Sequence, residues 1–320
     1  MKNAPKLIAN VNFKLLQTFL LVADQSSFRI AAEKSFRSPS AVSAQIRQLE
    51  GQLGVALFHR TTRNVHLTTE GEQLLDCARR ALNEVESGLR RIQEAADVRR
   101  GQVSISCSPT IAETRLARVL AAFEMEYPGI EVSVRELTST ALFDSVRNRE
   151  VDFGIGPAIE TLEFDFDAVM LDALYALVPK RFITTAKRSI SLATLTNMPL
   201  LLLSPATALR GMLDQALRER NLSFSTRYQF TQAQTLISMA TAGLGAAILP
   251  RVALPPRVDP STQVLRITNP SLVRQVAIVT LRGQKLSPAS LRLVQLLKLL
   301  LPDALEQPGN AGAAAAAASA

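Results

Sequence analysis

The chain contains few of the residues on which catalytic, metal and disulfide sites depend. Its 320 residues include two cysteines, two histidines and no tryptophan, and aromatic residues make up only 5% of the chain. Cys77 and Cys107 do not have a metal-binding spacing. His59 and His66 lie away from any carboxylate pair or hydroxyl nucleophile pattern, and Gly243-Leu-Gly245 is too short for a phosphate-binding loop. We therefore predict no catalytic residues, no metal and no cofactor, and a protein that is not an enzyme.

Long apolar runs are also missing from the sequence. No run approaches the length that spans a membrane, and the first ten residues lack the apolar core of a signal peptide. Two cysteines in such a chain suit a reducing compartment. We expect a cytoplasmic protein with no membrane partner. The segment 303–320 is rich in alanine and low in complexity, and we expect a disordered tail there.

Acidic residues are scarce at one end of the chain. Between Met1 and His66, nine lysines and arginines stand against three acidic residues, so this segment carries +6 of the net charge of +8. Positive charge confined to one end indicates a dedicated module that binds a polyanion. A membrane surface would attract the same charge, but it would not require the pattern that lies within this segment.

That pattern is typical of a helix-turn-helix. A short helix from Ser27 to about Lys34 precedes a second helix, which Ser38 caps and which has Pro39 at its first position. In the second helix the apolar residues Val42, Ile46, Leu49 and Leu53 recur at helical spacing and form one buried stripe. The opposite face carries hydrogen-bonding side chains without a carboxylate, which suits a helix in the major groove of DNA. The predicted base-edge contacts are Ser38, Ser40, Ser43, Gln45 and Arg47.

Two short strands are predicted after the second helix. The stretch 57–67 places apolar residues on both sides of a polar turn that carries Arg60 and Arg63. A hairpin of this kind would lie over the DNA backbone or the minor groove, where arginine is favoured. The whole pattern predicts a winged helix-turn-helix. The alternative is a helical hairpin with a solvated basic face.

Residues 69–99 contain no proline and predict one long linker helix. An apolar seam at steps of three and four residues runs along it, formed by Leu75, Ala78, Leu82, Val85, Leu89, Ile92 and Ala96. Such a seam needs a partner. In one interpretation the partner is the same helix of a second copy, and in the other it is the following domain of the same chain.

From about residue 100, strand-like runs alternate with helices. We expect strands at 103–107, 130–136, 152–156, 200–203, 223–230, 246–249 and 273–281, helices between the runs of each half, and a last helix at 288–301. Repeated strand-helix units indicate an α/β fold with a parallel sheet. Roughly 200 residues fit two lobes better than one core. The chain would cross between the lobes near 171–175 and near 269–273.

Hydroxyl-bearing residues follow several of these strands at the start of the next helix. Helix N-termini accept carboxylate or phosphate oxygens, and ligands of open α/β sheets collect at the carboxyl ends of strands. In the other interpretation these residues are simple helix caps. Arg210 is a further candidate, as an ion-pair partner for a ligand. The predicted ligand-binding residues are Ser108, Thr110, Thr138, Ser139, Ser204, Thr207, Thr231 and Gln232.

The N-terminal pattern resembles that of the LysR-type transcriptional regulators. The resemblance is carried by Phe19, Ser27-Phe28, Ala31-Ala32, the stretch 38–53, Leu57-Phe58, Arg60, Leu67-Thr68 and Gly71. It is specific over the first quarter of the chain and looser beyond. Many members begin the recognition helix with Ser-Gln-Pro-Ala, whereas this chain has Ser38-Pro39-Ser40-Ala41, and Ala44 replaces an arginine often found there. The operator preference of better-known relatives therefore does not carry over.

The resemblance implies a bilobal periplasmic-binding-protein-like domain with an effector in the cleft between its lobes. It also implies dimers, further association into tetramers, and a two-fold related site on double-stranded DNA. RNA polymerase is a further candidate partner. Some members use a disulfide switch between paired cysteines of the effector domain, but Cys107 stands alone there, so we expect an inert buried thiol.

We therefore predict an α/β fold with four parts. They are a winged helix-turn-helix at 1–68, a linker and dimerisation helix at 69–99, an effector-binding domain at 100–302, and the tail at 303–320. Lobe I of the effector domain would comprise about 100–172 and 272–302, and lobe II about 173–271. The predicted function is transcriptional regulation in response to a small anionic effector, for which a carboxylate is the leading candidate. The alternative is a soluble solute-binding or enzymatic α/β domain with a basic anchoring N-terminus.

Overall fold

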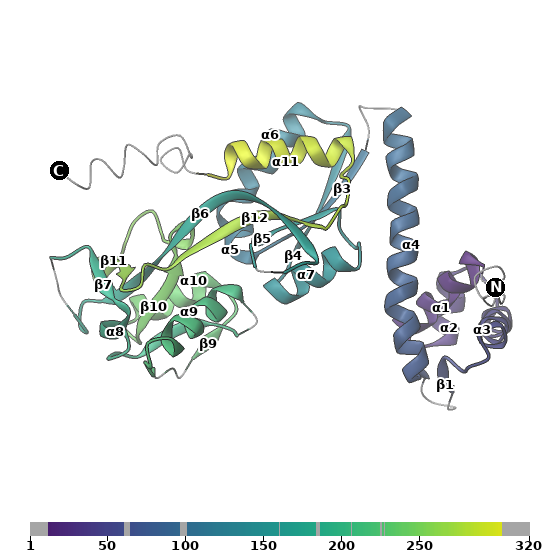
Figure 1. Ribbon diagram of the computed structural model, residues 1–320, viewed down its shortest axis with the longest axis horizontal. Coiled ribbons are helices and arrows are strands. Elements are labelled where there is room, and N and C mark those ends of the chain that lie inside the picture. The colour runs from purple at the N-terminus through teal and green to yellow at the C-terminus, as the bar shows by residue number, and fades with distance from the viewer. Residues whose placement is uncertain are drawn as a thin grey trace, which may run out of the picture. The chain divides into compact units, whose positions relative to one another are not determined.

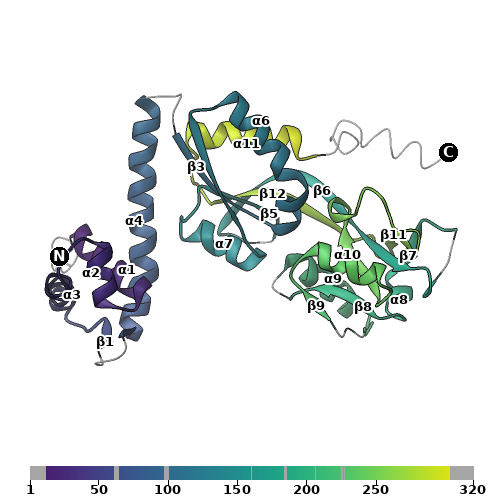
Figure 2. The ribbon, with the colours of Figure 1, turned by 180° about the vertical axis from the view of Figure 1, so that it is seen from behind.

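The computed structural model describes residues 12–60, 65–96, 101–159, 161–183, 186–205, 207–224, 226 and 228–302. The chain divides into two compact units, Met1–Arg90 and Arg91–Ala320. Figure 1 shows the helices of the first unit and the mixed helices and strands of the second, and Figure 2 shows both from behind. The expected tail, 303–320, lies outside the described residues.

The N-terminal unit is a winged helix-turn-helix, as predicted. Its elements are the helices α1 (Phe13–Gln25), α2 (Phe28–Lys34) and α3 (Pro39–Leu53), the strands β1 (Phe58–Arg60) and β2 (Val65–Leu67), and the long helix α4 (Thr69–Ala96). The strands pair in antiparallel fashion and form the wing. A core of buried apolar side chains, with Phe19, Val42 and Ile46 at its centre, joins the three short helices to the wing.

Local signals fix the ends of α3. The Ser38 hydroxyl accepts a hydrogen bond from the backbone N–H of Ala41 at 3.2 Å, and Pro39 occupies the first turn. Gly54 ends the helix with a φ of +74°, which glycine adopts without steric cost. The start of α4 then packs closely on the preceding loop, because a Cβ at Gly71 would lie 2.2 Å from the carbonyl oxygen of Leu57.

The two ends of α4 differ in burial. Near its start, Ala78 is buried and Arg79 forms an ion pair with Asp24 of α1 at 2.7 Å, so this part belongs to the core of the N-terminal unit. Farther along, Val85, Leu89 and Ile92 are 42%, 57% and 70% exposed. The later part of the expected seam is therefore an exposed apolar stripe.

The C-terminal unit consists of two lobes, and lobe I is built around three parallel strands. Strand β3 (Gly101–Cys107) pairs with β4 (Ile130–Glu136) and with β5 (Phe153–Pro157). The chain enters its first helix through α5 (Pro109–Ile111) and a π-helical turn (Ala112–Leu116) before α6 (Ala117–Glu126). Helix α6 lies beside α11 (Pro288–Leu300) on one side of the sheet, and α7 (Ser139–Arg147) lies on the other (Figures 1 and 2).

Lobe II is built around β8 (Leu200–Leu203) and β10 (Ala246–Pro250), which are parallel and fully buried. Its other elements are β7 (Ser189–Ser191), α8 (Leu192–Leu195), α9 (Ala208–Arg218), β9 (Gln229–Phe230), α10 (Ala233–Thr241), a 3-10 turn (Arg251–Ala253) and β11 (Thr262–Thr268). A separate apolar core fills this lobe, so each lobe has its own core.

Two long strands connect the lobes. Strand β6 (Phe164–Pro179) pairs with β12 (Val273–Leu281) over its first part and with β10 and β11 over its second part. The expected crossing near 171–175 lies on β6, and the one near 269–273 lies in the turn that leads from β11 into the first residue of β12. All of these pairings are antiparallel, so the expectation of a parallel sheet holds for β3, β4, β5, β8 and β10 but not for the strands that join the lobes.

The strand expected at 223–230 is much shorter in the structure. Among the described residues of this segment, only Gln229–Phe230 form a strand, β9, because these two are the ones that pair with the end of β8. Residues 222–224 form no strand. In the described part of the chain, no helix combines the length and the hydropathy needed to cross a bilayer.

Candidate nucleic-acid interface and effector cavity

The exposed face of α3 carries most of the predicted DNA contacts. Ser38, Ser40 and Arg47 are exposed, and Ser43 is half-buried. The hydroxyl oxygens of Ser38 and Ser40 lie 2.9 Å apart at the start of the helix. The helix therefore presents two hydroxyl groups at its N-terminal end and a cation in its middle.

Gln45 has a more complex position than the sequence predicted. Its Oε1 accepts hydrogen bonds from the Thr18 hydroxyl at 2.8 Å and from Nη1 of Arg37 at 2.7 Å. Thr18 lies on α1 and is buried, and Arg37 lies in the turn before α3. The carbonyl end of Gln45 thus ties α1, the turn and α3 together. Sequence reasoning missed Arg37, because nothing local shows that its guanidinium turns toward the protein.

The wing is formed by β1 and β2, with His59 opposite His66 in the pairing. Arg60 is the last residue of β1, and its side chain lies outside the described part of the structure. Arg63 also lies outside the described residues. The wing is therefore present as a hairpin, and the role of both arginines stays a prediction.

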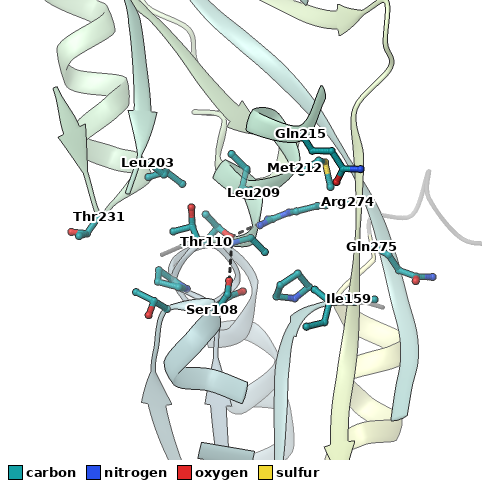
Figure 3. A pocket seen from close by; sticks show the side chains of 18 residues that line it. Ser108, Thr110, Ile159, Leu203, Leu209, Met212, Gln215, Thr231, Arg274 and Gln275 are labelled. Atoms are coloured by element: carbon teal, nitrogen blue, oxygen red, sulfur yellow. Dashed lines mark hydrogen bonds between the residues drawn. The ribbon is translucent and has the colours of Figure 1, made fainter. Parts of the chain in front are cut away.

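A cavity of about 620 Å³ lies between the two lobes of the C-terminal unit. Its walls come from the carboxyl ends of β3, β4 and β5 in lobe I and of β8 and β9 in lobe II, where α/β sheets bind ligands. Figure 3 shows Ser108 and Thr110 across from Leu203 and Leu209, with Arg274 reaching in from β12. The volume is in the usual range for a small-molecule site.

Six of the eight predicted ligand-binding residues line this cavity. They are Ser108, Thr110, Thr138, Ser139, Thr207 and Thr231. Ser204 and Gln232 are not among the lining residues. The remaining wall is largely apolar and includes Ile159, Leu209 and Met212.

The hydroxyls at the helix N-termini divide into two kinds. Thr207 caps α9, because its Oγ1 accepts a hydrogen bond from the N–H of Arg210 at 3.4 Å. Ser108 and Thr138 hold the N-cap positions of their helices without a side-chain capping bond. Ser108 is nevertheless only 6% exposed. Simple capping therefore accounts for Thr207 but not for Ser108 or Thr138.

A hydrogen bond between Ala208 and Ser139 joins the lobes across the cavity. The N–H of Ala208, the first residue of α9 in lobe II, donates to the Ser139 hydroxyl of lobe I at 3.0 Å. Both residues line the cavity. Ser139 therefore occupies a donor at the N-terminus of α9 that an anionic ligand would also use.

A buried ion pair lies where the two connecting strands meet. Arg274 of β12 and Asp172 of β6 are register partners, and Nε and Nη2 of Arg274 both donate to Oδ2 of Asp172, at 3.0 and 2.8 Å. Asp172 is fully buried, and Arg274 is 7% exposed. Oδ1 of Asp172 accepts from the N–H of Val252 in lobe II, while Nη2 of Arg274 donates to Thr110 in lobe I. The pair thus connects both lobes to the cavity wall.

The arginine at the cavity is Arg274 and not Arg210, which the sequence suggested as the ion-pair partner of a ligand. Arg210 is not a lining residue, because its Nε bonds Asp214 on the same helix at 2.8 Å and its guanidinium lies 5.3 Å from the centre of the Phe224 ring. Cys107 is fully buried next to this site, and burial with the nearby Glu136 raises the pKa of its thiol. A protonated, enclosed thiol is unreactive, in agreement with the expected inert role.

Comparison with known families covers nearly the whole described chain. Residues 13–72 match the bacterial regulatory helix-turn-helix protein, lysR family, and residues 96–301 match the LysR substrate binding domain. The uncharacterized HTH-type transcriptional regulator YfeR of Shigella flexneri is 30% identical over 88% of this chain and 91% of its own. The transcriptional dual regulator GltC of Bacillus subtilis is 27% identical over 88% of this chain and 94% of its own.

Solved structures show the same fold. A full-length OxyR variant from Pseudomonas aeruginosa is 22% identical, with a TM-score of 0.70 over 93% of this chain and 97% of its own. Full-length CbnR complexed with its target DNA is 21% identical, with a TM-score of 0.64 over 90% of this chain and 99% of its own. The effector binding domain of QuiR in complex with shikimate is 16% identical, with a TM-score of 0.55 over 62% of this chain and 96% of its own.

These matches do not favour the alternative of a solute-binding or enzymatic domain with a basic anchor, since both the DNA-binding and the effector-binding parts are matched, and the regulator family is not enzymatic in general. The chain belongs to the LysR family and is a DNA-binding transcriptional regulator with an effector-binding domain.

Proposed function

We propose that this regulator binds a small carboxylate between its lobes and that the ligand changes how a dimer sits on a two-fold related operator. The observation that carries the proposal is the pair Ser108 and Thr138, which stand at helix N-termini without capping them. Backbone N–H groups at a helix start favour negative charge, and the hydroxyls add donors beside them. None of the described residues that line the cavity is an aspartate or a glutamate, so no carboxylate among them opposes an anion.

Arg274 supplies the positive charge of the cavity wall, but Asp172 already balances most of it. Its Nε and Nη2 are engaged by Asp172 and Thr110, and Nη1 makes no hydrogen bond within the described part of the chain. We assign Nη1 and the hydroxyl of Thr110 to the ligand as additional donors. A single partly balanced cation suits a monocarboxylate with an apolar body, which Ile159, Leu209 and Met212 would contact.

Ligand binding would act through the strands that join the lobes. A ligand that contacts both lobes favours one relative orientation of them, and β6 and β12 are the segments that must adjust. The Asp172–Arg274 pair lies at that point and touches both lobes through Val252 and Thr110. Operator DNA must then change effector affinity by the same factor as the effector changes DNA affinity.

For DNA recognition we propose that α3 enters the major groove with Ser38, Ser40, Ser43 and Arg47 at base edges or phosphates. Gln45 would use its amide N–H groups, because its carbonyl oxygen is held by Thr18 and Arg37. Arg60 and Arg63 of the wing remain assigned to the backbone or the minor groove. The basic segment and the exposed polar face of α3 support this assignment.

The exposed stripe on α4 supports a dimer. Val85, Leu89 and Ile92 follow helical spacing, and an apolar stripe of this kind packs against an equivalent helix. We propose that a second copy covers it and that dimers associate further into tetramers. We retain the domain division 1–68, 69–99, 100–302 and 303–320, a cytoplasmic location with the chromosome, and RNA polymerase as a partner.

Calorimetry of the intact protein tests the effector proposal. The panel pairs carboxylic acids, shikimate included, with their neutral amides and esters. Ser108→Ala and Thr138→Ala should weaken binding of an acid about tenfold, as expected for lost bonds to a charged group. Ser133→Ala is the matched control, because Ser133 is exposed on β4 and is not a lining residue. Binding of neutral compounds alone, or binding indifferent to both substitutions, would overturn the proposal.

Salt-titrated DNA binding tests the interface. Arg60→Ala and Arg63→Ala should weaken binding to all duplexes and flatten its salt dependence. Ser43→Ala should instead reduce the difference in binding free energy between the specific duplex and nonspecific duplexes, by about 1–3 kcal/mol for a good base contact. The reverse pattern would exchange the roles of α3 and the wing.

A further inference from the structure

We propose that Phe36 is a sequence-specific DNA contact, whose ring packs against a thymine methyl group at the edge of each operator half-site. The inference rests on the proposed placement of α3 in the major groove. It adds an apolar base contact to a DNA-binding surface whose other proposed contacts are hydroxyl, amide and guanidinium groups.

Phe36 occupies a backbone position that normally belongs to glycine. Helix α2 ends at Lys34, and the N–H of Phe36 donates to the carbonyl of Glu33 at 3.2 Å, while that of Arg37 donates to Ala32 at 2.9 Å. These two bonds define a Schellman end, in which the residue at position 36 is left-handed. Its φ of +52° is costly for a bulky side chain, whereas glycine or asparagine adopts it readily.

The ring gains no packing from the described part of the chain that could offset this strain. Phe36 is 96% exposed, more than any other large apolar residue described. The neighbouring Arg37 turns toward Thr18 and Gln45, so the turn sends its cation inward and its aromatic ring outward. Strained residues of this kind cluster at functional sites.

The position of the turn points to DNA as the partner. Phe36 precedes the N-cap Ser38 by two residues, so the two Cα atoms are at most about 7 Å apart. Residues at the start of a recognition helix are the ones that approach base edges. The only apolar group on a base edge in the major groove is the thymine methyl, and phenylalanine is a known partner for it. The surrounding segment is basic and attracts a polyanion such as DNA, and bound DNA would bring the thymine methyl group within reach of the Phe36 ring.

The test uses the intact protein and the duplex that it enriches most strongly from a random pool. Each thymine of that duplex is replaced in turn by deoxyuridine, which removes only the methyl group. At one symmetry-related pair of thymines, the wild type should lose about fivefold in affinity. Phe36→Gly and Phe36→Asn should bind the parent duplex about tenfold more weakly and should be indifferent to that replacement. Both variants should melt at the same temperature as the wild type or a few degrees above it, because the strain is relieved.

Three outcomes would overturn the assignment. One is unchanged affinity in both variants, and another is an equal loss on all duplexes, which would indicate a contact with the backbone. The third is a lower melting temperature or an altered oligomeric state, which would place the ring in a protein interface. Absence of any enriched duplex for the wild type would instead contradict the proposed function itself, so the two failures are distinguishable.

Discussion

Lobe I and lobe II both present helix N-termini to the same cavity, but they use the hydroxyl groups there differently. In lobe II the Thr207 hydroxyl caps α9 and also donates to the carbonyl of Ser204 at 2.9 Å. In lobe I the hydroxyls of Ser108 and Thr138 make no capping bond. The Thr207 hydroxyl of lobe II is thus engaged within its own lobe, whereas lobe I keeps the hydroxyls of Ser108 and Thr138 available as donors.

A serine or threonine at the start of a helix can therefore have either a structural or a ligand-binding role, and its hydrogen bonds show which. A hydroxyl that already satisfies its own helix loses a bond when it turns to a ligand, so its net gain is small. A hydroxyl that caps nothing has no such cost. We infer that ligand selectivity is set mainly by lobe I and that lobe II mainly supplies apolar contact area.

The largest effect is expected where the two lobes are joined. Asp172→Ala leaves the buried guanidinium of Arg274 without its counter-charge, and the free energy of unfolding should fall by about 3–5 kcal/mol. Urea denaturation followed by circular dichroism measures it. The control is the double variant Asp172→Leu with Arg274→Met, which removes both charges and should recover most of the loss. If the free energy of unfolding of Asp172→Ala lies within about 1 kcal/mol of the wild-type value, the ion pair does not stabilise the connection between the lobes.

Ser108→Ala tests the lobe I side of the comparison. It removes a hydroxyl that faces the cavity and caps nothing, so it should weaken carboxylate binding about tenfold, or by about 1.4 kcal/mol, while changing the free energy of unfolding by less than about 0.5 kcal/mol. Calorimetry and urea denaturation on the same preparation separate the two effects. A loss of stability without a loss of affinity would mean that Ser108 is a structural residue after all.

Local sequence signals predicted the elements that depend on neighbouring residues. The Ser38-Pro39 start of α3 follows from capping chemistry, and strand-like runs marked β4, β8 and β12 at the bounds that the structure shows. The hydroxyls of the cavity were found because each follows a strand that is followed in turn by a helix.

Interactions between distant residues could not be predicted in this way. Strand β6 has acidic residues within it, and its extended form is decided by pairing with β12, β10 and β11, all far along the chain. Asp172 and Arg274 are separated by 102 positions, and neither is marked by its neighbours. In the same way, nothing near Gln45 shows that Thr18 and Arg37 would engage its carbonyl oxygen.

Thr207→Ala tests the lobe II side and should have a smaller effect. Loss of the cap of α9 should reduce the free energy of unfolding by about 1 kcal/mol. Effector affinity should change less than about twofold, because this hydroxyl is already bonded within lobe II. Thr207→Ser keeps the cap and serves as the control in urea denaturation and calorimetry. A larger loss of affinity than of stability would erase the distinction between the lobes.

The smallest effect, with the most informative sign, is expected for Ser139→Ala. The Ser139 hydroxyl accepts the N–H of Ala208 from the other lobe, and a carboxylate in the cavity would compete with it for that donor. Removing the hydroxyl frees the donor, so a carboxylate should bind about two- to threefold more tightly, which corresponds to about 0.5 kcal/mol. Ser139→Thr keeps a hydroxyl and should bind like the wild type. If calorimetry shows weaker binding by Ser139→Ala, the hydroxyl itself contacts the ligand, and Ser139 then joins Ser108, Thr110 and Thr138 as a ligand-binding hydroxyl of lobe I.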